Sequence, residues 1–227
     1  MSQVTPGHET MDKRKAGMVD EKVFALYLEA LLKGNRSQCG QLVDRLLEAD
    51  IDIKDLYTGL FQDSLYRVGE LWENNTISVA TEHVATAITE GLLSRLYPRI
   101  FAAEHCGKKA VISCVANEWH QIGGKMVADI FELNGWDTDF IGANTPVDDL
   151  VRHIDLVGPD VLGLSLSLYS NMEVLLQTIA TIRSHFHELH IFCGGQAFRW
   201  GGLEKLRQIT GTEYIPSLHV LEQTLVN

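Results

Sequence analysis

Residues 117–123 carry the groups best suited to binding a ligand. Their sequence is Asn-Glu-Trp-His-Gln-Ile-Gly, and they follow the short apolar run 110–115. A carboxylate two positions before an imidazole suits a metal site: Glu118 can accept a hydrogen bond from one ring nitrogen of His120 and leave the other ring nitrogen for the metal. Gly123 is expected to let the backbone turn tightly into a following helix. On this stretch alone, a surface loop that merely contains a histidine is the competing interpretation.

Two further polar stretches follow apolar runs in the same way. Residues 163–171 read GLSLSLYSN and residues 193–196 read CGGQ. If the apolar runs are strands of one parallel sheet, these stretches lie at the edge of the sheet where ligands bind. Small hydroxyl residues and paired glycines at adjacent strand ends are expected to leave room for a flat ligand between loop and sheet. Gly-Gly after a strand is also ordinary turn chemistry, so alone it carries little weight.

The second half of the chain, residues 109–227, alternates apolar runs with amphipathic runs. Strands are expected at 110–115, 137–141, 161–166, 190–193 and 213–215, and helices are expected to begin near Gly123, Pro146, Asn171, Leu203 and Ser217. Strands that alternate with helices predict an α/β domain with a five-stranded parallel sheet. The expected strand order is 2-1-3-4-5, the flavodoxin-like order among Rossmann-type folds.

The first part of the chain is expected to form a four-helix bundle. Apolar residues recur at helical spacing in the stretches 21–33, 37–49, 54–75 and 78–97. Ser37 and Ser78 are the expected caps of the second and fourth helices, and Pro98 is expected to stop the fourth. Short connections between amphipathic helices favour a bundle, here over residues 21–101. Residues 1–20 are polar and aperiodic, so a disordered tail is expected there.

Composition narrows the classes of function. The 227 residues carry a formal net charge of −11 and show no helix-turn-helix or zinc-finger pattern, so direct binding of nucleic acid is not expected. No apolar run approaches the roughly 20 residues of a membrane span, and the N-terminus lacks the apolar region of a signal peptide. The four cysteines have no metal-site spacing, and Cys114 and Cys193 fall in expected strands. A cytoplasmic protein with buried free thiols is the expectation.

Taken together, the three polar stretches resemble the signature of the cobalamin-binding domain family. That signature is Asp/Glu-x-His-x-x-Gly, then Ser-x-Leu, then Gly-Gly, and here Ser167 stands where the family has the Leu. The resemblance implies that His120 replaces the benzimidazole of cobalamin as the lower cobalt ligand. The displaced nucleotide tail would run between the serines of the third strand end and the glycines of the fourth. The preceding bundle matches the cap domain that covers the upper corrin face, so the resemblance covers about residues 21–225.

The resemblance implies a specific set of residues around the cofactor in the α/β domain. These residues are Glu118, His120, Gln121, Ile122, Gly123, Ser165, Ser167, Tyr169, Gly194, Gly195 and Gln196. Among them only His120 is expected to bind the metal. Trp200, which follows Gly-Gly-Gln-Ala-Phe-Arg, is expected to pack in the fold rather than to lie near the nucleotide tail.

A second motif lies in the expected bundle. Trp72 is followed, after nine residues, by Glu82 and His83. Taken singly, these residues would be a core tryptophan, a capping glutamate and a buried histidine. Beside a cobalamin-binding domain, Trp-x9-Glu-His resembles the cobalamin photoreceptor subfamily, whose members hold light-sensitive adenosylcobalamin or aquo/hydroxocobalamin. By this resemblance Trp72 occupies the space above the corrin, and Glu82 and His83 contact the upper ligand.

The chain departs from the light-regulated repressors of that subfamily in two respects. Those proteins carry a histidine directly after the tryptophan, where this chain has Glu73, so a second axial histidine is not expected there and His83 is the remaining candidate. They also carry an N-terminal DNA-binding domain, which this sequence lacks. The chain looks like the short antirepressor-type photoreceptors, which act through a protein partner. A related stand-alone group pairs cobalamin with a bilin, and the sequence leaves that second chromophore open.

The expected function is that of a light sensor and not of an enzyme. Loss of the upper ligand would change the conformation and signal to a partner protein, a transcription regulator or an output module. The alternative is a corrinoid carrier protein of a methyltransferase system, which shares the fold and His120 but needs an open upper face. The Trp-x9-Glu-His motif favours the sensor. The sequence leaves open the upper ligand, a homodimeric state and the identity of the partner.

Overall fold

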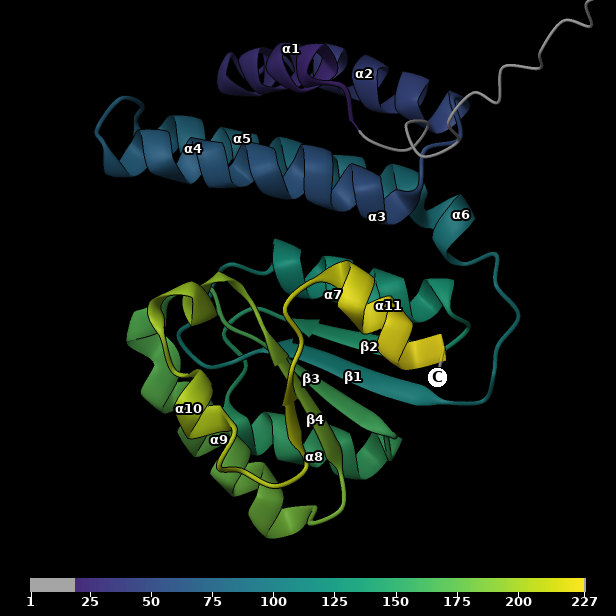
Figure 1. Ribbon diagram of the computed structural model, residues 1–227, viewed down its shortest axis with the longest axis vertical. Coiled ribbons are helices and arrows are strands. Elements are labelled where there is room, and N and C mark those ends of the chain that lie inside the picture. The colour runs from purple at the N-terminus through teal and green to yellow at the C-terminus, as the bar shows by residue number, and fades with distance from the viewer. Residues whose placement is uncertain (1–18, 227) are drawn as a thin grey trace, which may run out of the picture. The chain divides into compact units, whose positions relative to one another are not determined.

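The computed structural model describes residues 19–226, and the chain folds as two compact units, one up to Thr89 and one from Glu90 onward (Figure 1). The tail expected over residues 1–20 lies outside the described residues, except for Val19 and Asp20. Every helix among residues 19–226 is too short or too polar to span a membrane.

The first unit consists of helices, as expected. Its elements are α1 (Glu21–Leu32), α2 (Arg36–Glu48), α3 (Ile53–Leu56), the π-helical turn η2 (Tyr57–Gln62), α4 (Asp63–Glu73) and the greater part of α5 (Val79–Leu93). Helices α3, η2 and α4 follow one another without a break. The described residues of the first unit therefore form four helical segments. Asn35, and not Ser37, caps α2, because its side-chain oxygen accepts the N–H of Gln38 at 3.1 Å.

Aromatic side chains fill the core of this unit. The π-helical turn was expected to be a regular part of a longer helix; it brings Tyr57, Leu60 and Phe61 into the interior together. The ring centroid of Phe61 lies 6.1 Å from that of Tyr57 and 6.1 Å from that of Tyr27 on α1. Tyr27 and Phe61 are completely buried, so α1 and the π-helical turn share one core.

The second unit is an α/β domain that begins with the end of α5. Its elements are η3 (Ser94–Leu96), α6 (Tyr97–Ile100), β1 (Lys109–Cys114), α7 (Ile122–Leu133), β2 (Asp137–Gly142), α8 (Val147–Val157), β3 (Val161–Ser165), η4 (Tyr169–Asn171), α9 (Met172–His185), β4 (His190–Gly194), η5 (Gln196–Trp200), α10 (Leu203–Leu206), β5 (Thr212–Tyr214) and α11 (Leu218–Val226). Helix α5 stops before Pro98, as expected, and Pro98 itself lies in the first turn of α6, where its missing N–H costs no hydrogen bond.

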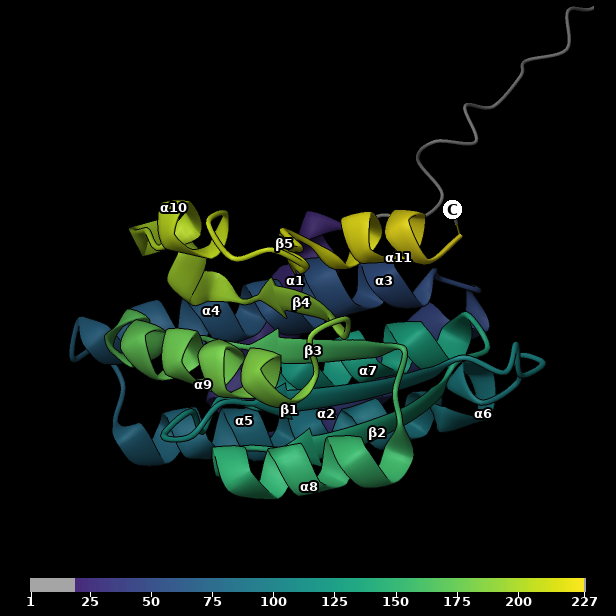
Figure 2. The ribbon, with the colours of Figure 1, turned by 90° about the horizontal axis from the view of Figure 1, so that it is seen from below.

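The five strands form one parallel sheet in the order β2-β1-β3-β4-β5, which confirms the flavodoxin-like expectation. Helices α7 and α11 lie on one face of the sheet and α8 and α9 on the other (Figure 1). Figure 2 shows α8 and α9 in front of the strands. Strand β3 is buried along its whole length, as a central strand covered on both faces must be.

The strand register decides which loops meet at the carboxyl edge of the sheet. Cys114 at the end of β1 pairs with Ser165 at the end of β3, and Ser165 pairs with Gly194 at the end of β4. Three adjacent strands therefore end level with one another. The loops that follow them start side by side, at the edge where ligands of such sheets bind.

Candidate cofactor site

The carboxylate of Glu118 connects two of these loops. Glu118 is fully buried, and its Oε1 accepts hydrogen bonds from the backbone N–H of His120 at 3.0 Å and from Nδ1 of the His120 ring at 2.6 Å. Its Oε2 accepts the backbone N–H groups of Ser167 and Leu168, each at 2.9 Å. One side chain thus fixes its own loop against the loop that follows β3.

These donors keep Glu118 ionised. Burial alone would raise the pKa of the carboxyl group, since a charge is poorly solvated in the protein interior. The hydrogen bonds from the His120 ring and from the N–H groups of Leu168, His120 and Ser167 outweigh burial and lower the pKa to about 2. Glu118 is therefore an anion over the physiological pH range.

The anion determines which nitrogen of His120 carries the proton. A carboxylate can only accept, so Nδ1 of His120 must be the donor in the 2.6 Å contact, and the lone pair of the neutral ring lies on Nε2. The side chain of His120 is 52% exposed, so the ring is accessible from solvent. A histidine fixed by a buried carboxylate is the arrangement found at metal sites.

The surroundings of His120 favour a metal that brings most of its own ligands. Within residues 19–226, no cluster of three or more His, Cys, Asp or Glu side chains is placed to hold an ion. Burial, followed by the nearby charge of Glu118, raises the pKa of Cys114 to about 12, so that thiol remains protonated and is a poor ligand. A single imidazole fits an axial position on a metal held in a macrocycle.

The cysteines agree with the expectation from the sequence. Cys39, Cys114 and Cys193 are buried, Cys106 is exposed, and all four thiols are free.

Three asparagines, which sequence reasoning missed, hold the loop that carries Glu118 and His120. The N–H of Asn117 donates to Oδ1 of Asn144 at 2.8 Å, and the N–H of Asn144 donates to the carbonyl of Glu118 at 2.8 Å. Asn171 donates from Nδ2 to the carbonyl of Asn117 at 3.0 Å. Asn117 and Asn144 adopt φ values of 64° and 51°, which asparagine tolerates better than most residues. The sequence signal that could have indicated this network is an asparagine in the loop after each of three strands.

The residues after His120 start the next helix. Gln121 donates from Nε2 to Oε1 of Glu90 at 3.0 Å, and Ile122, which is buried, opens α7. Gly123 does not provide a tight turn: it lies in the first turn of α7 and is not among the glycines with positive φ. The glycine that close packing requires is Gly124, where an added Cβ would lie 3.1 Å from Cε2 of Phe140.

The glycines after β4 are explained by contacts within the chain. Gly195 has a φ of 118°, and an added Cβ would lie 2.0 Å from the carbonyl oxygen of Leu166. At Gly194 an added Cβ would lie 3.0 Å from the carbonyl oxygen of Ile215. Backbone from the loop after β3 therefore explains why residue 195 is a glycine, and room for a ligand beside the paired glycines stays a prediction.

The remaining residues expected around the tail differ in exposure. Ser165 is buried at the end of β3, Ser167 is partly buried, Tyr169 is 45% exposed, and Gln196, which opens η5, is partly buried. Trp200 does not pack in the core as expected: it is 78% exposed. The structure therefore brings Glu118, His120 and the serine-rich loop together by hydrogen bonds and places Gly194 next to Ser165 by strand pairing.

In the first unit, a tight turn joins the two parts of the Trp-x9-Glu-His motif. Just after α4, Asn75 adopts a φ of 55°. The N–H of Asn75 donates to the carbonyl of Trp72 at 2.9 Å, and the N–H of Thr76 donates to the carbonyl of Leu71 at 2.8 Å. Ser78 caps α5 as expected, since its Oγ accepts the N–H of Thr81 at 3.2 Å. Figure 1 shows this turn joining the end of α4 to the start of α5.

The motif side chains are not core residues. Trp72 is 47% exposed and the side chain of His83 is 73% exposed, so the interpretation of a core tryptophan and a buried histidine is wrong. Oε2 of Glu82 lies 2.5 Å from Nδ1 of His83, and its Oε1 accepts a hydrogen bond from Thr86 at 2.9 Å. The glutamate is therefore fixed, with the imidazole held beside it at the surface.

Comparison with known families agrees with this geometry. Two models described as B12 binding domain match the chain, one over residues 108–212 and the other over residues 23–97. The two matches together take in most of the sequence, and the chain therefore contains the two B12 binding domains that these models describe. The expected membership of the cobalamin-binding family is confirmed.

Two individual proteins are similar to part of this chain. The HTH-type transcriptional repressor CarH of Myxococcus xanthus is 29% identical over 133 residues, which are 58% of this chain and 44% of CarH. The HTH-type transcriptional repressor CarA of the same organism is 33% identical over 90 residues, 39% of this chain and 31% of CarA. The chain thus spans less than half the length of the curated relatives it matches.

A solved structure shares the fold. The monomethylamine corrinoid protein of Methanosarcina barkeri superimposes with a TM-score of 0.77 and 14% sequence identity, over 91% of this chain and 98% of that one. The helical region followed by a five-stranded parallel sheet is therefore the fold of a corrinoid protein.

Proposed function

We propose that the protein is a cobalamin-dependent photoreceptor that binds its cofactor base-off, with His120 as the lower cobalt ligand. The observation that carries the proposal is the 2.6 Å hydrogen bond between buried Glu118 and Nδ1 of the exposed His120 ring. With the proton held on Nδ1, the lone pair of the half-exposed His120 ring lies on Nε2, in the loop at the carboxyl edge of the sheet. The similarity to CarH and CarA supports a sensor within the B12-binding family.

The residues of the second unit have distinct roles in this proposal. Glu118 holds the proton on Nδ1 and raises the basicity of Nε2, and the N–H groups of Ser167 and Leu168 keep Glu118 in place. Ser165 and Gly194, which are neighbours in the sheet, are proposed to border the nucleotide tail. The other residues proposed to line the site are Gln121, Ile122, Gly123, Tyr169, Gly195 and Gln196.

The residues of the first unit are proposed to face the upper side of the corrin. Bound adenosylcobalamin supplies a cobalt–carbon bond that light breaks. Trp72 offers a large, half-exposed apolar surface at the turn between α4 and α5, and Glu82 offers a carboxylate fixed by Thr86 and His83. Loss of the upper ligand would leave an empty space beside Trp72, and the Trp72 side chain would then be free to repack. That movement is the proposed signal.

The proposed photoreceptor has two domains and acts through a protein partner. The cap is assigned to residues 21–101 and the cobalamin-binding domain to residues 109–227. The chain is proposed to act without catalysing a reaction, through a transcription regulator or an output module. The proposal leaves open a bilin as a second chromophore.

The second candidate is a corrinoid carrier protein, because the fold and the Glu118–His120 pair would serve a carrier equally well. A carrier must admit a partner active site to the upper corrin face, which the motif of Trp72, Glu82 and His83 would obstruct. The absorption spectrum and the hydrodynamic radius of the protein loaded with adenosylcobalamin, measured in the dark and after blue-green light, together separate the two. A lasting spectral change with a change in hydrodynamic radius supports the sensor, and a protein whose radius is insensitive to light supports the carrier.

A further inference from the structure

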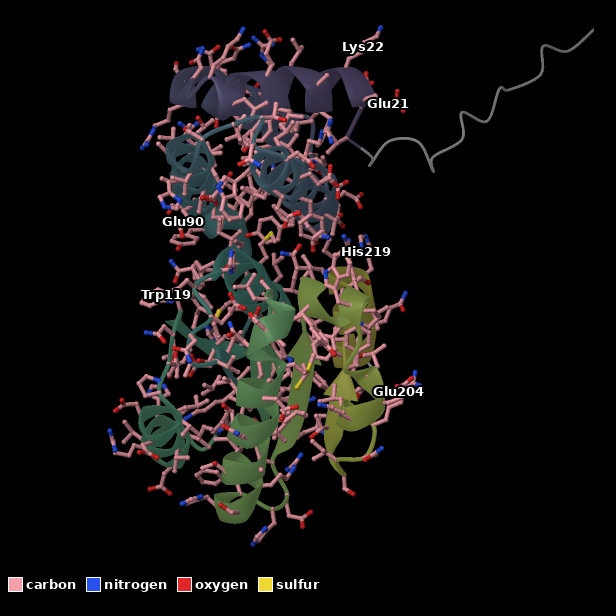
Figure 3. The ribbon with its side chains drawn as sticks, turned by 90° about the vertical axis from the view of Figure 1, so that its left-hand side faces the viewer. Glu21, Lys22, Glu90, Trp119, Glu204 and His219 are labelled. Carbon is pink, nitrogen blue, oxygen red and sulfur yellow. The ribbon has the colours of Figure 1, made fainter. Side chains whose placement is uncertain are left out.

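Trp119, between Glu118 and His120, is exposed in a way that the fold does not require. Its side chain is 69% exposed, whereas Glu118 beside it is completely buried. Figure 3 shows Trp119 projecting outward from the second unit. Single exposed apolar residues are common on protein surfaces and need no explanation by themselves. Trp119 differs from such residues because it stands between Glu118 and His120, in the loop proposed to hold the cofactor.

The backbone on both sides of Trp119 is fixed. Asn117 donates its N–H to Asn144 and accepts a hydrogen bond from Asn171, while the N–H of His120 donates to Glu118. The indole is thus held in solvent by a rigid loop, not carried by a loose one. A large apolar side chain displayed by a rigid loop at the ligand-binding edge of a sheet is typical of a binding residue.

The orientation of a corrin relative to its axial ligand indicates what would cover the indole ring of Trp119. A corrin plane lies perpendicular to the bond between cobalt and its axial nitrogen, and the macrocycle is several residues wide. The Cα atoms of Trp119 and His120 are separated by only about 3.8 Å, as in any trans peptide. An exposed indole attached this close to the axial histidine is long enough to reach the face that the macrocycle would present.

We infer that Trp119 packs against the corrin ring on the face that His120 binds, a contact that rests on the proposed cobalamin function. The indole offers a flat apolar surface to the methyl groups of the macrocycle, and its N–H can donate to an amide carbonyl at the corrin periphery. The benzimidazole occupies this face in base-on cobalamin, so the contact forms only with base-off cobalamin or with a corrinoid that lacks the base.

The inference is tested by titrating the full chain with two corrinoids, aquocobalamin and cobinamide, which has the corrin but not the nucleotide tail. Trp119→Ala should weaken the binding of both by a similar factor, on the order of tenfold, because both bury the indole. Trp119→Phe should recover part of the loss for both. Leu156→Ala is the matched control: Leu156 is 82% exposed in α8 and close to the amino end of β3, away from the carboxyl edge. It should change neither affinity.

Three results would overturn the inference. If Trp119→Ala binds both corrinoids as wild type does, Trp119 does not touch the corrin, while the cobalamin function stands. If the variant loses affinity for aquocobalamin alone, Trp119 contacts the nucleotide tail. If wild type binds neither corrinoid, the proposed function itself fails and the contact fails with it. Far-UV circular dichroism of each variant confirms that the fold is retained.

Discussion

The carboxylate of Glu118 donates nothing and accepts four hydrogen bonds, the shortest from the ring of His120 at 2.6 Å. A buried anion thereby holds the proton of His120 on Nδ1 and presents Nε2. The same anion binds the N–H groups of Ser167 and Leu168, so the geometry of the histidine depends on the loop after β3. The proposed metal ligand and the serine-rich loop are one structural unit.

Replacing Glu118 by glutamine should weaken cobalamin binding by roughly 10- to 100-fold, the usual effect of removing the partner of a metal-bound histidine. The amide keeps the size of the side chain but removes the charge that orients the ring and stabilises Nδ1–H. The measurement is the dissociation constant for aquocobalamin. Glu204→Gln, at an exposed position of α10, is the control and should bind normally. Equal affinity of Glu118→Gln and wild type would contradict the assigned role.

The pH dependence of stability should reveal the same carboxylate. Its pKa is lowered from 4.5 to about 2 in the folded chain, so the stabilisation is present above pH 4.5 and is lost as the pH falls toward 2. At neutral pH it is worth about 3 kcal/mol, at about 1.4 kcal/mol per pKa unit. Urea unfolding of the cofactor-free protein and of Glu118→Gln should show a difference in unfolding free energy that shrinks as the pH falls from about 4.5 toward 2. A difference that does not change with pH would mean that Glu118 is not ionised through this network.

Trp72→Ala should load cobalamin in the dark nearly as well as wild type but lose most of the light-driven change in hydrodynamic radius. The reason is that Trp72 is proposed to contact the upper ligand, while His120 and the second unit provide most of the binding. Size-exclusion chromatography before and after illumination measures both properties. Leu26→Ala is the control, because Leu26 on α1 has the same exposed fraction of 47% as Trp72. A full light response in Trp72→Ala would remove the basis for the sensor.

Specific binding to duplex DNA is not expected of this chain. Its net charge of −11 opposes the approach to phosphates. A gel-shift experiment with promoter and random fragments at moderate salt should show no sequence-dependent complex. A specific complex with one fragment would show that the chain itself acts on DNA and needs no partner regulator.

Local patterns predicted those parts of the fold and of the site that depend on residues near in sequence. Alternating strands and helices predicted the sheet order, and Ser78 was identified as the cap of α5. Glu118 and His120 are two residues apart, so their hydrogen bond could be predicted from spacing alone.

The features that were missed depend on residues far apart in sequence. The N–H of Asn117 finds its partner at Asn144, and Gly124 is required by Phe140 and Ser165. Gly195 avoids a clash with Leu166, which no local pattern indicates. Trp200 is exposed although Phe198, two residues earlier in the same short helix η5, is buried, because residues two apart in a 3₁₀-helix lie on different faces.

His120 is proposed to bind cobalt in place of the benzimidazole. Electron paramagnetic resonance of the reduced Co(II) form tests this coordination most directly. Protein labelled with ¹⁵N-histidine and loaded with unlabelled cobalamin should show each cobalt line split into a doublet, because one ¹⁵N nucleus is the axial ligand. The doublet should disappear in His120→Ala, which removes Nε2 without touching the other histidines. A triplet in the labelled wild-type protein, from the ¹⁴N of the retained benzimidazole, would contradict the account.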